Sequence, residues 1–553
     1  MTERGRITRA IIVAVVLTVA LAGCVGIPSS GGVNEGPAVK SGGDSAFVTD
    51  PVGPPRNASK TELVNDFLQA ATSADNNYAI AKEYLTAKAA QSWVPTNSVL
   101  VREKPATPED VGDNTVDYAV STNSSVDALG VYSQQASDST QTLSYTFTRV
   151  AGQWRISDLP NGIVLSRTSF ENFFNPYPIY FFDPDYRYLV PDVRWFPTGP
   201  TVQDRIVIAL LAGPSDWLQQ GVVASAFPPG VLRGSPVVIH NSTATVDFSA
   251  NAASTKPTVR GQMKLQLQQS LLALNITSVS MTARGAPLAI ASADDSDAQI
   301  AVPANGSALI QRGKQFGFYP GLESLGGIST EVAQLNGTAA TLDRGDSTAA
   351  VLAKGGVYLV TSTAAKPVDT RPDLIAPSID TFGYVWSVPS SDPSAIRAYG
   401  PDGVAHPISS NLPTGSTIVS LDVSHDGTRV LMYLETSAGP LLVVAGIVRR
   451  GGVPASLGDP LDLPVSSDDP IDATWVNSTT VAALASGDSQ DTVISYMIGG
   501  TSGDVSTTED AVRLVGGIDS DSLRLITDNG EVQQLRASGW QNIAVASMLA
   551  TQQ

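Results

Sequence analysis

The feature that most constrains the fold is a spaced repetition in residues 310–553. Short apolar runs flank a polar turn in five segments, which cover residues 340–352, 378–386, 421–431, 473–482 and 517–525. The turn centres Gly345, Gly383, Gly427, Ser478 and Asp521 are about 38, 44, 51 and 43 residues apart, close to the ~40–50 residues of a propeller blade. Glycine and aspartate suit these positions because tight hairpin turns require positive φ. The repetition predicts an all-β propeller of about four to six blades over residues 310–553, with a pair of β-sandwiches as the alternative.

The N-terminus has the anatomy of an export signal. Arg4, Arg6 and Arg9 precede an apolar run over residues 11–21, which is too short to span a bilayer as a helix. The run ends in Leu-Ala-Gly-Cys at residues 21–24, which resembles the lipobox of bacterial lipoproteins. The resemblance implies a signal peptide over residues 1–23, cleavage before Cys24, and a diacylglycerol with acyl chains such as palmitate on the Cys24 sulfur. An uncleaved anchor with an incidental cysteine is the alternative.

A flexible tether is predicted for residues 24–58. This segment is rich in Gly, Ser and Pro and shows no apolar periodicity, so it is expected to lift the folded part off the membrane. No second long apolar segment follows in the sequence. The sequence therefore predicts an envelope protein that is lipid-anchored on the extracytoplasmic face of the cell membrane.

A small α+β domain is predicted for residues 59–168. Leu63, Val64 and Phe67 lie on one face of a helix that Ser59 or Thr61 is expected to cap. Residues 142–148 alternate between apolar and polar types, and residues 153–156 are expected to return as a partner strand after a turn at Gly152. Two helices followed by a curved sheet resemble the nuclear-transport-factor-2-like (NTF2-like) cone.

Residues 169–300 predict a second α+β domain. A helix through Leu211 is expected to end at Gly213-Pro214. The phrase "LLAGP" at residues 210–214, followed by "ATVDFS" from Ala244, resembles the GerMN domain of spore germination and maturation proteins. Residues 170–196 are rich in Phe, Tyr and Trp, which suits a core seam between two domains or, as the alternative, an exposed partner site.

The sequence predicts no catalytic residues, no cofactor and no metal site. His240, His406 and His425 each lack a second His, Cys or carboxylate at a metal-ligand spacing; His240 is expected to end a strand and His425 to be solvated in a turn. Cys24 is the single cysteine, and neither a Gly-x-Ser-x-Gly elbow nor a phosphate-binding Gly-x-x-x-x-Gly-Lys loop occurs. The net charge of −18 argues against nucleic acid as a partner, because phosphates select basic surfaces.

The order of these parts resembles the LpqB family of actinobacterial lipoproteins. The motifs that carry this resemblance most clearly are residues 210–214, "GQWRIS" at residues 152–157 and "VSHDGTRV" at residues 423–430. The resemblance implies an accessory regulator that contacts the ectodomain of the sensor histidine kinase in a two-component system of the MtrA–MtrB type, in cell-wall homeostasis. It supplies no catalytic residues.

Two other functions remain as alternatives to the accessory regulator. One is a protein that binds cell-wall glycan or peptidoglycan fragments in the central opening of the propeller. The other, ranked last, is a wall hydrolase that uses a scattered carboxylate pair.

Overall fold

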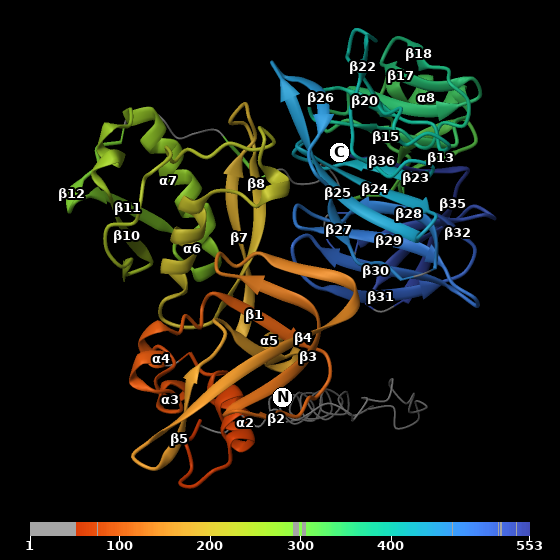
Figure 1. The fold of residues 1–553 in the computed structure, drawn as a ribbon. Helices are drawn as coiled ribbons and strands as arrows, with labels where there is room; N and C mark the ends of the chain where they lie inside the picture. The colour runs from red at the N-terminus through yellow and green to blue at the C-terminus, as the bar shows by residue number, and fades with distance from the viewer. Residues whose placement is uncertain are drawn as a thin grey trace, which may run out of the picture. The chain divides into compact units, whose positions relative to one another are not determined.

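The computed structural model describes residues 51–553, except residues 75, 291–297, 301–305, 467, 518, 520–521 and 538 (Figure 1). The predicted signal peptide, Cys24 and most of the predicted tether lie outside the described residues. Within the part that is described, no helix combines the length and the apolar character needed to cross a membrane.

The N-terminal domain, residues 51–173, packs short helices against a curved mixed sheet, in which β1 and β6 are parallel and the other pairs antiparallel (Figure 1). The helices are α2 (Lys60–Ala70), α3 (Ala79–Glu83), α4 (Ala87–Ser92) and α5 (Arg167–Phe173). The strands are β1 (Ser98–Arg102), β2 (Glu109–Gly112), β3 (Thr115–Asp127), β4 (Tyr132–Val150), β5 (Gln153–Asp158) and β6 (Ile163–Ser166), in the order β5-β4-β3-β1-β6 with β2 on β3.

The predicted first helix is confirmed as α2. Ser59 caps it through a reciprocal pair of bonds with Glu62, a capping box that satisfies two free N–H groups. Its apolar face, Leu63, Val64 and Phe67, is buried in the domain core. The predicted strand pair is also confirmed, because β5 returns antiparallel to the end of β4.

The residues just before α2 contact the domain. The Tyr84 hydroxyl donates to the carbonyl of Val52 at 2.8 Å. The Asn57 side chain accepts from Gln153, and the Asn57 backbone N–H donates to the same side chain. The chain is therefore fixed to the N-terminal domain from about residue 52 onward.

The middle domain begins with a long two-stranded hairpin and continues into a small four-stranded sheet (Figure 1). The hairpin consists of β7 (Phe174–Phe182) and β8 (Leu189–Pro197), and the helices are α6 (Val202–Ala212) and α7 (Pro257–Leu271). The sheet has the order β12-β11-β10-β9, from β9 (Val238–His240), β10 (Thr243–Phe248), β11 (Ser278–Ala283) and β12 (Ala286–Pro287). Short 3₁₀ helices cover Asp216–Leu218, Ala250–Ser254 and Leu272–Leu274.

The predicted end of α6 is confirmed. Its C-cap is Gly213 at φ +104°, a backbone conformation that glycine adopts at little cost. Pro214 follows and cannot continue a helix. Helix α7 connects the parallel strands β10 and β11, and Met263, Leu267 and Leu271 bury its apolar face.

The aromatic stretch of residues 170–196 lies inside the protein. Phe170, Phe174 and Trp195 belong to the core of the N-terminal domain, whereas Phe181 and Phe196 belong to the core of the middle domain. Burial of these rings confirms the prediction of a seam between two packed domains.

The C-terminal region, residues 306–553, is a succession of sheets whose strands pair antiparallel except for β15 and β36 (Figure 1). Within its described residues the sheet orders are β14-β13-β36-β15-β16-β17-β18, β19-β20-β21-β22, β23-β24-β25-β26 with β27 on β25, β28-β29-β30-β31 and β32-β33-β34-β35. One helix, α8 (Gly327–Leu335), precedes β15. The strand bounds are β13 (Leu309–Arg312), β14 (Gln315–Phe318), β15 (Ala339–Leu342), β16 (Thr348–Ala353), β17 (Gly356–Thr361), β18 (Ala365–Asp369), β19 (Ser378–Ile379), β20 (Val385–Ser387), β21 (Arg397–Tyr399), β22 (Ala405–Pro407), β23 (Thr417–Val423), β24 (Arg429–Thr436), β25 (Gly439–Arg450), β26 (Val453–Leu457), β27 (Leu461–Leu463), β28 (Asp469–Trp475), β29 (Thr480–Ser486), β30 (Asp491–Met497), β31 (Ser502–Thr508), β32 (Ala511–Val515), β33 (Arg524–Thr527), β34 (Glu531–Arg536), β35 (Gly539–Val545) and β36 (Met548–Gln552).

Four of the five predicted turns each connect two consecutive, paired strands in one of four successive sheets. Gly345, Gly383, Gly427 and Ser478 lie in the β15–β16, β19–β20, β23–β24 and β28–β29 turns, and Asp521 is outside the described residues. Gly383 and Gly427 have the positive φ that was expected, but in the first turn the positive φ falls on Asp346 instead of Gly345. At Gly427 a side chain is also excluded by space, since a Cβ would lie 2.7 Å from the ring of Phe382.

Strand β36 connects the two ends of the C-terminal region. It pairs antiparallel with β13, through Leu549 and Ile310, and parallel with β15, through Thr551 and Thr341. The last strand of the chain therefore lies between the first strands of the region.

Candidate functional site

Polar side chains of the innermost strands bind the backbone of the neighbouring sheet. In each case a side-chain oxygen accepts an N–H group: Ser378 from Val423 at 3.1 Å, Asp422 from Trp475 at 3.3 Å, Asp472 from Leu514 at 2.9 Å, and Thr474 from Gly516 at 3.1 Å. These N–H groups are buried and need a partner. The polar residues of the core thus join consecutive sheets.

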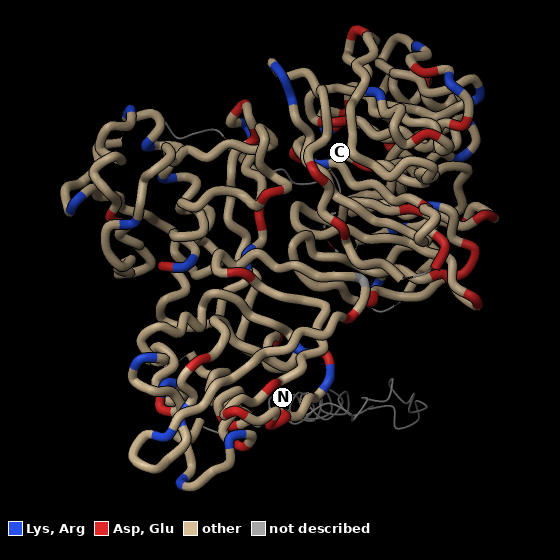
Figure 2. Tube along the Cα trace, in the orientation of Figure 1, with Lys and Arg blue, Asp and Glu red and all other residues tan. Residues whose placement is uncertain are grey.

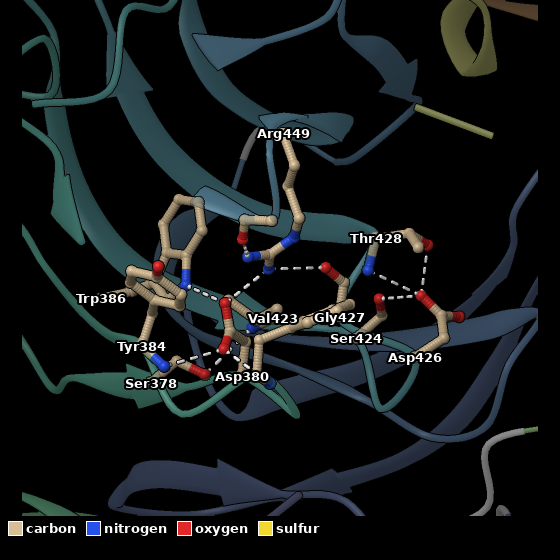
Figure 3. A network of polar contacts seen from close by, with 12 residues as sticks. Ser378, Asp380, Tyr384, Trp386, Val423, Ser424, Asp426, Gly427, Thr428 and Arg449 are labelled. Carbon is tan, nitrogen blue, oxygen red and sulfur yellow. Dashed lines mark hydrogen bonds and ion pairs between the residues drawn. The ribbon is translucent and has the colours of Figure 1, made fainter. Parts of the chain in front are cut away.

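A buried ion pair joins the β19–β20 turn to the next sheet. Asp380 accepts from the Arg449 guanidinium at 2.6 Å and from the Trp386 indole at 3.0 Å, and its other oxygen accepts the N–H groups of the turn (Figure 3). Arg449 also donates to the carbonyl of Gly427 at 3.0 Å, and its guanidinium lies 3.9 Å from the ring centre of Phe382. The side chains of Asp380 and Arg449 are 0% and 2% exposed.

A second buried pair repeats this arrangement one sheet further on. Asp426 accepts from Ser424 at 2.7 Å and from the Thr428 N–H at 2.9 Å (Figure 3), and it also accepts from Arg429. Arg429 also donates to the carbonyl of Ser478 in the following turn, at 2.8 Å. Arg449, in β25, therefore contacts the β19–β20 and β23–β24 turns, and Arg429 contacts the β23–β24 and β28–β29 turns. The side chains of both pairs are buried.

The central cavity, which lies between the innermost strands, is almost filled by the protein itself. Its volume is about 10 Å³, and it is lined by Asp422, His425, Trp475, Arg524 and Thr551 among others. A cavity of this size holds about one water molecule, whereas small-ligand sites measure ~300–1,000 Å³. This cavity is therefore far too small to hold a glycan.

His425 is buried, and the prediction of a solvated side chain is wrong. Within the described residues neither ring nitrogen has a partner at full hydrogen-bond geometry. Burial, as the largest cause, lowers its pKa to about 4, and the neighbouring Gln553 side chain opposes this shift. The β23–β24 turn faces the central cavity instead of the solvent, a placement that turn composition does not reveal. His240 ends strand β9 and is exposed, as expected, and His406 lies in β22 beside the ring of Tyr384.

Asp422 titrates in the opposite sense to His425. Burial raises its pKa to about 6, and the hydrogen bonds from Trp475 and Ser378 oppose the rise. Because the folded chain holds this proton more tightly than the unfolded chain, Asp422 adds stability as the pH falls from about 6 to about 4. His425 takes up its proton first in the unfolded chain, so it removes stability as the pH falls from about 6.5 to about 4.

Single substitutions should expose these two opposed contributions. In the Asp422→Asn variant only the destabilising contribution of His425 remains. We therefore expect acidification from pH 7 to pH 4 to lower the free energy of unfolding of this variant by about 3 kcal/mol more than that of the parent. His425→Leu should shift the profile by a similar amount in the other direction. Urea denaturation of the full chain at both pH values measures the differences, and the exposed His240→Asn is the control. Parallel profiles for the two variants would disprove this account.

The described residues contain no group of three or more His, Cys, Asp or Glu side chains placed to hold a metal ion. The sequence also missed the arginine–aspartate pairs. The Asp426–Arg429 pair had a local signal, since "SHDGTR" at residues 424–429 places an arginine three residues after the turn aspartate. The Asp380–Arg449 pair had no such signal, because its residues lie 69 positions apart.

Three family models match the chain in sequence order. The N-terminal domain of lipoprotein LpqB matches residues 53–171, a model described as sporulation and spore germination matches residues 178–289, and the LpqB β-propeller domain matches residues 320–550. The second match confirms the predicted GerMN-like domain.

Among solved structures, the tandem GerMN domains of GerM from Bacillus subtilis are 20% identical, with 22% of this chain and 45% of that chain covered and a TM-score of 0.19. The β-propeller domain of Cps50 (Swd1) from Myceliophteria thermophila is 10% identical, with 34% and 79% covered and a TM-score of 0.25.

Curated relatives cover most of the chain. Lipoprotein LpqB of Cutibacterium acnes is 28% identical over 511 residues, which are 84% of each chain. Lipoprotein LpqB of Streptomyces coelicolor is 25% identical over 81% of this chain and 80% of its own. Three matched domains in one order and relatives that span nearly the whole length show that this protein belongs to the LpqB family of lipoproteins.

Proposed function

We propose that this chain is a lipid-anchored envelope protein that regulates a sensor histidine kinase by binding its ectodomain, in a two-component system of the MtrA–MtrB type. Membership of the LpqB family carries this proposal. Anchoring through Cys24, after cleavage of residues 1–23, would place the described residues on the extracytoplasmic face of the membrane. Binding would act on signalling by favouring one kinase state through differential affinity.

The fold proposed for the C-terminal region is a closed β-propeller. If β36, β13 and β14 are taken as one blade, the described sheets amount to six blades. Closure would come from β36, because it pairs with β13 from the start of the region and with β15 of the next blade. A closed ring leaves no open edge between first and last blade. Its outer surfaces are then the ones offered to a partner.

The N-terminal domain is proposed to be an NTF2-like cone. Support comes from the strongly bent sheet, in which β3 and β4 pair along most of their length and shift register near Thr122, and from α2–α4 packed on its concave side. A hollow of about 80 Å³, lined by Phe67, Leu143 and Tyr145 among others, lies between helix and sheet.

Capture from membranes tests the kinase proposal. The full chain, purified in detergent, would be immobilised and incubated with detergent-solubilised envelope of the source bacterium, and captured proteins would be identified by mass spectrometry. We expect reproducible enrichment of one sensor histidine kinase and a change in its phosphotransfer when the chain is added. Retention of muropeptides without any kinase would overturn the proposal in favour of a glycan-binding protein.

A further inference from the structure

An open groove lies between the outermost strands of two adjacent sheets. It has a volume of about 570 Å³, and its walls come from the end of β31 and the start of β35, with contributions from β33, β34, the turns after β31 and β33, and Gln490 just before β30. Both β31 and β35 are edge strands of their sheets. We call it the acidic groove; its lining residues with acidic or aromatic side chains are Glu509, Asp510, Glu531 and Trp540.

The lining has one sign of charge. Glu509, Asp510 and Glu531 line the groove, and no Lys, Arg or His does. The other lining residues are hydroxyl or amide side chains, apart from Gly539 and Trp540. None of the three carboxylates takes part in an ion pair or a side-chain hydrogen bond within the described residues, so each of them can accept a cationic group from a ligand.

The surroundings strengthen this charge. Residues 451–553 contain 14 acidic residues and three arginines, a formal net charge of −11 out of −18 for the whole chain. Two of these arginines, Arg513 and Arg524, turn inward, toward Thr551 and Gly306. Figure 2 shows the resulting concentration of acidic segments in the loops next to β31 and β35. Such a field attracts cationic groups and repels phosphates and other anions.

The shape of the groove selects an extended ligand. The carboxylates do not converge as a metal-binding group among the described residues, so one ion cannot satisfy all of them. The groove runs between two strand edges, and such edges offer free backbone groups to an added extended chain. Trp540 adds an aromatic face of the kind that attracts ammonium and guanidinium groups.

We propose that the acidic groove binds an extended segment of a protein partner that carries several lysine or arginine side chains. The inference rests on the proposed function, since it specifies the chemistry of the partner that the protein binds. A neutral glycan would use the hydroxyl and amide groups of the lining but would leave the three carboxylates without counter-charge.

Peptide binding to the full chain, purified in detergent, tests the proposal. The probe is a fluorescently labelled extended peptide of about ten residues with lysine at every second position, and the comparison peptides carry glutamate or serine there. We expect the lysine peptide alone to bind, and the triple variant Glu509→Gln, Asp510→Asn, Glu531→Gln to bind it about 10- to 100-fold more weakly. Affinity should also fall steeply between about 50 and 500 mM salt.

A matched variant separates a site from general attraction to an acidic protein. Asp113→Asn, Asp158→Asn, Glu171→Gln removes the same charge at exposed positions of the N-terminal domain, and it should bind the lysine peptide as the parent does. An equal loss of affinity for the lysine peptide in both triple variants would overturn the proposal that the groove is its binding site. Binding of a chitin-type oligosaccharide that is insensitive to salt and lost in the groove variant would overturn it in favour of a glycan site.

The capture experiment distinguishes this failure from failure of the proposed function. A kinase captured equally by the parent and the groove variant would leave the kinase proposal standing and refute the groove as its contact. A kinase captured by the parent and lost with the groove variant supports both.

Discussion

Replacement of Arg449 by alanine is expected to lower the free energy of unfolding by about 3–5 kcal/mol, the usual cost of removing one partner of a buried ion pair. The substitution leaves Asp380 charged and 0% exposed, with its bond to Trp386 as the remaining side-chain contact. It also removes the donor to Gly427 in the adjacent turn. Urea denaturation of the full chain, followed by tryptophan fluorescence, measures the loss, because Trp386 is part of the network.

Two further variants make this prediction specific. Arg450→Ala removes the neighbouring arginine, which is exposed, and is expected to change stability by less than about 0.5 kcal/mol. The double variant Arg449→Met, Asp380→Asn should recover part of the loss, since no unpaired charge then stays buried. If Arg449→Ala and Arg450→Ala proved equally stable, the pair would not hold the two turns together.

Replacement of Cys24 by alanine is expected to abolish lipid modification of the chain. Cys24 is the single cysteine, so no other thiol can accept the diacylglycerol. Each buried CH₂ of an acyl chain contributes about 0.8 kcal/mol to membrane attachment, and the variant should lose all of it. Labelling of cells with radioactive palmitate measures the modification, and the mass of the purified chain reports whether residues 1–23 are removed.

The control for this prediction is Ser30→Ala, a change near the same site that keeps the thiol. It should be labelled and processed as the parent is. Palmitate in the Cys24→Ala chain would show that the lipid is attached elsewhere, and the predicted lipobox would then be wrong.

Local sequence patterns predicted the elements whose causes are local. The capping box of Ser59 and Glu62, the stop at Gly213-Pro214 and the four hairpin turns each depend on a few adjacent residues. The family resemblance to LpqB was likewise carried by short phrases, such as residues 152–157 and 210–214.

Features that depend on distant partners were not predicted. The apolar alternation of residues 142–148 revealed only part of β4, which is a 19-residue strand. The earlier residues of β4 are mostly polar and form a strand by pairing with β3, so they show no alternation. Burial of His425 follows from its position at the central cavity, and the Asp380–Arg449 pair joins residues 69 positions apart. The acidic groove arises where two sheet edges meet, which no single segment of sequence encodes.

The position of β36 has a consequence for the order of folding. Residues 309–312 and 339–342 gain their shared neighbour only when residues 548–552 pair with them, so a loop of more than 200 residues must close before these strands are joined. Until residues 548–552 pair, β13 and β15 each keep one unpaired edge, and unpaired strand edges are prone to aggregate. Truncation or proteolytic loss of a few terminal residues should consequently be more damaging than their number suggests, because it removes the strand that joins the two ends of the C-terminal region.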